Sequence, residues 1–153
     1  MLLVQAAGAM AFGVHYLLIG AHTAALLLLI AGLQALAAIP LGTRPGFRLV
    51  YLATVPAIAA VMAFSWQGPA SLFASLGLAM ISLGRYQTKT VPFRAFLVAC
   101  VPFWIVHNLM VWSVPGLFSD ALSMTSGLAM LIVTIRQERA IAGLALPTSS
   151  PPT

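Results

Sequence analysis

Charged residues are scarce in this chain. Among its 153 residues there are seven Lys or Arg and two Asp or Glu, so the charged share is 6%. Soluble domains carry roughly 25% charged residues, and nine charges are too few to cover a water-soluble fold of this size. Hydrophobic residues make up 61% of the chain, in runs long enough to cross a bilayer. The composition therefore predicts an integral membrane protein whose main partner is the lipid bilayer.

The scarcity of acidic residues and cysteine also limits the chemistry. Asp120 and Glu138 are expected on opposite sides of the membrane, so they cannot form an acid–base pair. Cys100 is the single cysteine and cannot form an internal disulfide. No Cys, Asp or Glu stands near either intramembrane histidine at metal-ligand spacing, and no glycine-rich phosphate loop is present. The sequence predicts no enzymatic activity, no metal and no cofactor.

The net charge of +5 does not indicate a nucleic-acid partner. A nucleic-acid-binding domain gathers its basic residues on one face of a polar surface. Here the seven basic residues stand in short gaps between apolar runs, where a membrane protein carries them.

Glycine, proline and charged residues divide the chain into six apolar runs. Backbone groups in lipid must be hydrogen-bonded within the segment, so each run is expected to be a helix. The predicted helices cover about residues 2–20, 21–41, 47–66, 70–86, 91–113 and 117–136. Pro69 suits the first position of the fourth helix. Residues 1–142 are thus predicted to form a single all-α transmembrane domain, and residues 143–153, rich in Pro, Ser and Thr, a disordered tail.

The basic residues predict the orientation of these six spans. They stand only around the second and fourth gaps and after the last run, at Arg44, Arg48, Arg85, Lys89, Arg94, Arg136 and Arg139. All seven therefore fall on one side of the membrane, which the positive-inside rule makes the cytoplasmic side. Both termini are then cytoplasmic. Tyr16, Trp66 and Trp112 fall near the outer boundary, where aromatic residues are expected to serve as anchors.

The first and fifth predicted helices share a pattern. Residues 12–19 and 104–111 align without a gap at an offset of 92, with identities at Val14/Val106, His15/His107 and Leu17/Leu109. Four spans separate the two copies, so they point the same way across the membrane. This pattern predicts a parallel internal repeat, an arrangement that some transporters use.

Polar and proline residues inside the spans are the candidates for function. His15 and His107 both stand about five residues, or roughly 7 Å, from the outer ends of their helices. Together with Asn108, Trp104 and Gln34 they predict an outer vestibule that holds a ligand. The alternative is a structural role, because such side chains also bond to carbonyl groups and hold helices together. Pro56 and Pro102 predict kinks, which serve either as hinges or as static bends.

Two segments resemble a known family. The stretch Cys100–Asn108 (CVPFWIVHN) and the stretch Val14–Gly20 (VHYLLIG), each with the helix that follows, resemble the YgjV family of bacterial inner-membrane proteins. The resemblance runs from about Gly8 to Arg136, and it implies a location in the inner membrane but no chemistry.

The resemblance also implies a seven-helix plan of three, one and three helices, of which this chain lacks the first. Met1 is then either the start of a shortened protein or an internal methionine. That plan is similar, by topology alone, to SWEET sugar transporters and related PQ-loop proteins.

The sequence leaves two functions open. The first is a small-molecule transporter built on the repeat. The alternative is a non-transporting membrane protein that acts through helix contacts with itself, as a homo-oligomer, or with a partner. A polar cavity lined by the candidate residues would favour the transporter, and a dry, filled interior would favour the alternative.

Overall fold

The computed structural model describes residues 2–144. They form six α-helices and one short 3-10 turn. The elements are α1 (Leu2–Leu18), α2 (His22–Leu41), the turn η1 (Pro45–Arg48), α3 (Leu49–Phe64), α4 (Pro69–Tyr86), α5 (Thr90–Met110) and α6 (Val114–Leu144). The predicted all-α helix bundle is confirmed.

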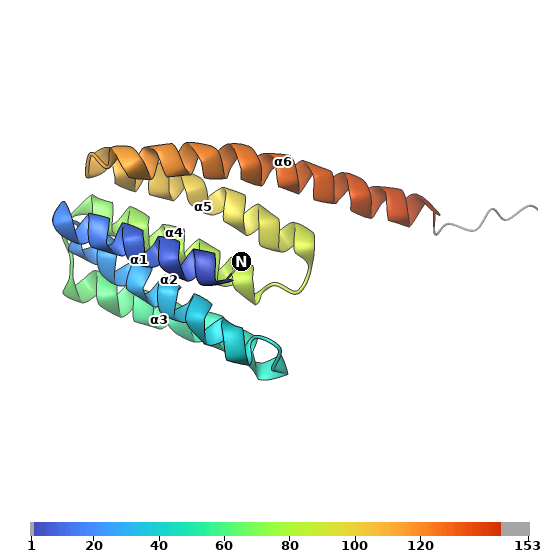
Figure 1. Cartoon of the computed structure of the whole chain (residues 1–153), viewed down its shortest axis with the longest axis horizontal. Coiled ribbons are helices and arrows are strands. Elements are labelled where there is room, and N and C mark those ends of the chain that lie inside the picture. The colour runs from blue at the N-terminus through green and yellow to red at the C-terminus, as the bar shows by residue number, and fades with distance from the viewer. Residues whose placement is uncertain (1, 145–153) are drawn as a thin grey trace, which may run out of the picture.

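The helices run up and down, each antiparallel to the next (Figure 1). The α1–α2, α3–α4 and α5–α6 turns lie at one end of the bundle. The α2–α3 and α4–α5 connections and the C-terminal part of α6 lie at the other end. Because these last segments and their flanks carry all seven basic residues, the positive charge gathers at one end of the bundle.

The middle of the bundle is formed by α2 and α4. Helices α1 and α3 pack against α2, α3 and α5 pack against α4, and α6 packs on α5. In the most apolar 18-residue window of each helix, 39% is buried in α2 but only 6% in α6. Helix α6 therefore presents most of its surface to its surroundings, which a lipid bilayer satisfies.

Four helical segments are long and apolar enough to cross a membrane. They are His22–Leu41, Gly46–Phe64, Thr90–Met110 and Val114–Gly143. Helix α1 is apolar but has 17 residues, and α4 has 18 residues and ends in Arg85 and Tyr86. The length of a transmembrane helix is about 20 residues, so α1 and α4 fall just short of it within the described chain.

The boundary between α5 and α6 differs from the predicted one. Helix α5 ends at Met110 because Trp112 adopts a left-handed backbone (φ 55°), which breaks the helix. Pro115 and Gly116 then lie in the first turn of α6, whereas the sequence placed them between the helices. A proline costs nothing in a first turn, since its missing N–H would have no partner there. Pro69 begins α4 for the same reason, as predicted.

The C-terminal boundary also moves. Helix α6 continues to Leu144, eight residues beyond the predicted 136, and so includes the first two residues of the predicted tail. The apolar residues Ile141 and Leu144 and the good helix formers around them favour this extension. The rest of that tail, residues 145–153, lies outside the described residues.

Pro56 and Pro102 lie inside α3 and α5, which continue through them. Pro40 lies inside α2 in the same way. Each proline removes one backbone hydrogen bond from its helix. The hinge role of Pro56 and Pro102 stays a prediction.

Candidate functional site

A chain of hydrogen bonds joins three helices at the level where α5 approaches its C-terminus. The Tyr16 hydroxyl of α1 donates to Asn108 Oδ1 of α5 over 2.6 Å. The Asn108 Nδ2 group donates to Asp120 Oδ2 of α6 over 2.8 Å. Tyr16 and Asn108 are 2% and 1% exposed, so water does not compete for these bonds. We name this arrangement the Tyr16–Asn108–Asp120 chain.

Asp120 lies deeper in the last helix than the sequence predicted, because α6 begins at Val114 rather than at residue 117. It is the seventh residue of α6, about 9 Å from the start of that helix. An ionisable residue at such a depth is costly in lipid and usually marks a functional site. Sequence reasoning missed Asp120 because it took Pro115 as a break, although a proline followed by an apolar run also fits a helix start.

A cavity of about 400 Å³ opens beside the Tyr16–Asn108–Asp120 chain between α1, α2, α4, α5 and α6. We name it the groove. Its polar and aromatic lining consists of Gln5, Phe12, Tyr16, Arg85, Trp104, Asn108, Ser119, Asp120 and Ser123. The rest of the lining is apolar and includes Leu28, Leu78 and Leu97.

Aromatic rings form one wall of the groove. The rings of Tyr16 and Trp104 stack with centroids 6.2 Å apart and an interplanar angle of 22°. Phe12 lies beside them, 6.3 Å from Tyr16. Behind this wall, a Cβ on Gly77 of α4 would stand 2.6 Å from Trp104 Nε1, so only glycine lets α4 come this close. Trp104 is therefore held in place, and Tyr16, expected to be an interfacial anchor, is buried instead.

The two predicted histidines occupy different environments. His15 Nε2 lies 2.9 Å from Ser113 Oγ. His107 Nδ1 lies 2.9 Å from the Ala70 carbonyl oxygen, and since a carbonyl only accepts, Nδ1 carries the proton. His107 Nε2 is buried without a partner among the described residues. Of the five residues predicted for a vestibule, the structure brings only Trp104 and Asn108 together in the groove.

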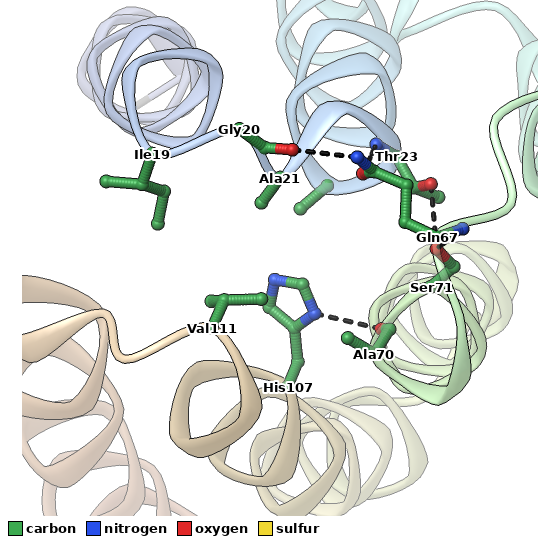
Figure 2. A pocket seen from close by; sticks show the side chains of 10 residues that line it. Ile19, Gly20, Ala21, Thr23, Gln67, Ala70, Ser71, His107 and Val111 are labelled. Carbon is green, nitrogen blue, oxygen red and sulfur yellow. Dashed lines mark hydrogen bonds between the residues drawn. The ribbon is translucent and has the colours of Figure 1, made fainter.

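His107 lines a second, smaller cavity of about 220 Å³, which we name the outer cavity. Figure 2 shows its ring between the α1–α2 turn and the start of α4. Gln67 Nε2 donates to the Gly20 carbonyl over 2.8 Å, and the Gln67 backbone N–H donates to Ser71 Oγ over 2.9 Å. These wall groups satisfy one another, and the surrounding Ile19 and Val111 are apolar.

Gln34 lies away from both cavities and links three helices. Its Nε2 donates to Thr54 Oγ1 of α3 over 2.8 Å, and its Oε1 accepts from Arg85 Nη1 of α4 over 2.8 Å. Gln34 is 3% exposed, so its amide oxygen, rather than water, accepts the hydrogen bond from Arg85. This is the structural role that the sequence left open for it.

Comparison with known proteins places the chain in a family. Residues 1–140 match the Imp-YgjV family model, which is described as a bacterial inner membrane protein. No curated protein and no solved structure matches the chain. The match covers more than nine-tenths of the sequence, including both helices that carry the Tyr16–Asn108 bond. The chain therefore belongs to the YgjV family of bacterial inner-membrane proteins.

Proposed function

We propose that the protein is a small-molecule transporter of the inner membrane, not an enzyme, and that the groove is part of the solute's route. The observation that carries this proposal is the groove itself, a cavity of about 400 Å³ with Tyr16, Asn108 and Asp120 on its wall. Burying polar groups away from water costs free energy. A helix bundle that only had to pack in lipid would have no need of a carboxylate beside a cavity.

We infer a parallel repeat from the sequence pattern, and such a repeat would suit a transporter. Tyr16 and Asn108 occupy equivalent positions at the offset of 92, and they bond to each other. Contact between equivalent positions is expected beside a two-fold axis that runs along the membrane normal. The helices α1 and α5 that carry them run in the same direction (Figure 1). The symmetry is incomplete, since His15 bonds to a side chain and His107 to a backbone carbonyl.

The second candidate is a non-transporting protein that acts through helix contacts with itself or with a partner. The exposure of α6, with 6% of its apolar window buried, favours it. Lipid satisfies an apolar helix face as well as a partner helix does, however. The carboxylate on the groove wall gives the transporter the stronger support.

We propose further that all six helices span the membrane and that both termini are cytoplasmic. The gathering of seven basic residues at one end of the bundle supports this orientation. A fluorescent protein joined after Thr153 should fluoresce, and alkaline phosphatase joined there should be inactive. The first reporter is active on the cytoplasmic side of the membrane and the second on the opposite side. Active phosphatase at this position would reverse the orientation.

Transport itself is tested with purified protein in liposomes. We expect time-dependent uptake of at least one solute from a panel of labelled amines, amino acids, polyols and carboxylates. Empty liposomes and liposomes with the heat-denatured protein serve as controls. Absence of flux for every solute, with circular dichroism showing folded helices, would contradict the transporter and favour the second candidate.

A further inference from the structure

We infer that the groove binds small organic cations, which the Asp120 carboxylate recognises together with the rings of Phe12, Tyr16 and Trp104. This inference rests on the proposed function only in naming the solute class for the proposed route. The recognition itself follows from charge, ring geometry and the size of the groove.

The carboxylate of Asp120 is partly free. Within residues 2–144, the one protein donor to it is Asn108 Nδ2, which bonds to Oδ2. Asp120 lines the groove, and none of the described residues donates to its other oxygen, Oδ1. A carboxylate in a medium of low polarity is stabilised by an opposite charge. A cation bound in the groove would therefore stabilise the Asp120 carboxylate.

The aromatic wall fits the same ligand class. An ammonium group is attracted to the face of an aromatic ring when it lies within about 6 Å of the ring centroid. The centroids of Trp104 and Phe12 lie 6.2 and 6.3 Å from that of Tyr16. Tyr16 and Trp104 stack on each other and are 2% and 8% exposed, so the half-buried Phe12 offers the most ring surface to a ligand. The Tyr16 hydroxyl is bonded into the Tyr16–Asn108–Asp120 chain, which fixes this ring relative to the carboxylate.

The size of the groove suits a small amine. Its volume of about 400 Å³ equals that of roughly a dozen liquid waters, at about 30 Å³ each. The groove also extends toward Arg85, so only its Asp120 end would hold the cation, and a quaternary ammonium head with a short substituent is smaller than the whole groove.

The other charged and titratable groups near the groove do not neutralise the charge of Asp120. Arg85 also lines the groove, but it lies next to Gly84, whose Cβ would stand 2.9 Å from Phe96 Cβ. Phe96 precedes Asn108 by twelve residues of α5, or about 18 Å along the helix. A small ligand at Asp120 therefore does not reach Arg85, which bonds to Gln34 instead. His15 bonds to Ser113, and His107 lines the outer cavity.

The test uses choline as the probe and Trp104 as the reporter. In a Trp66→Phe, Trp112→Phe background Trp104 is the single tryptophan, and the two removed residues are exposed. The protein is held in nanodiscs of phosphatidylglycerol. We expect choline to change Trp104 fluorescence saturably, and its neutral isostere 3,3-dimethylbutan-1-ol, which replaces N⁺ by carbon, to cause no saturable change. An equal response to both would overturn the inference, as would no response to choline.

Two charge-removing variants supply the matched comparison. Asp120→Asn should weaken choline binding at least tenfold, whereas Glu138→Gln, which removes the other acidic charge on the exposed end of α6, should leave it unchanged. Equal affinities for both variants would contradict the inference. The choline–isostere comparison on the parent protein needs no variant, so a misfolded Asp120→Asn protein would not prevent a decision.

A free amine and a lipid headgroup share this chemistry. Adding phosphatidylethanolamine to the nanodiscs separates them. Competition with choline identifies the headgroup ammonium as a ligand, and lack of competition identifies a soluble amine; both support a cation site. Choline binding without flux in liposomes would contradict the proposed transport and support the cation site. Flux of solutes without choline binding would support transport and contradict the cation site.

Discussion

Replacing Gly116 by alanine should destabilise the protein by roughly 1–3 kcal/mol, although alanine favours a helix over glycine. A Cβ at this position would stand 2.5 Å from Asn108 Cγ and 2.7 Å from its Nδ2. The amide would have to move away from the positions in which it serves Tyr16 and Asp120. The cost then combines crowding with two weakened hydrogen bonds, one of them to a carboxylate. Denaturant titration in mixed detergent micelles measures the loss.

Gly143→Ala is the control for this change. It makes the same substitution in the same helix, where a Cβ meets nothing within 4 Å. We expect that variant to be neutral or slightly more stable, because the gain in helix propensity is unopposed. If the Gly116 and Gly143 variants had equal stability, the Tyr16–Asn108–Asp120 chain would not be the rigid contact that we describe.

The helices could be predicted because lipid imposes a simple rule. Every apolar run must satisfy its backbone internally, so run length and breaks are enough to place helices such as α2 and α4 within a few residues. The prediction of the α5–α6 boundary was wrong because the residue types of Pro115 and Gly116 each have two structural roles. Proline ends a helix or begins one, and glycine turns a chain or admits a neighbouring side chain. The contact between Gly116 and Asn108 is tertiary and leaves no mark on local sequence.

The candidate site could be predicted only in part. Asn108 and Trp104 were found because polar and aromatic residues stand out in an apolar helix, and both line the groove. Their partners were missed, since Tyr16 resembles an interfacial anchor and Asp120 a residue at the outer boundary when the helix rotations are unknown. Conversely, the equal spacing of His15 and His107 suggested a shared site, but equal depth does not place two side chains in one cavity.

We propose that the groove is open to water and solute inside the membrane. Ser123 lines the groove and is the tenth residue of α6, about 14 Å from its start. Leu122 adjoins it on the same helix, is 56% exposed and does not line the groove. The cysteine thiolate attacks the methanethiosulfonate sulfur and displaces sulfinate, and the thiolate forms in water and not in lipid. Neighbouring cysteines at these two positions therefore separate a wet groove from a lipid-facing surface.

The measurement is labelling of Ser123→Cys and Leu122→Cys by a membrane-impermeant cationic methanethiosulfonate in native membrane vesicles. Cys100, which is 5% exposed, is first replaced by alanine so that each variant carries one thiol. We expect rapid labelling of Ser123→Cys and at least tenfold slower labelling of Leu122→Cys. An inert cysteine at position 123, or equal rates at both positions, would contradict a solute route through the groove.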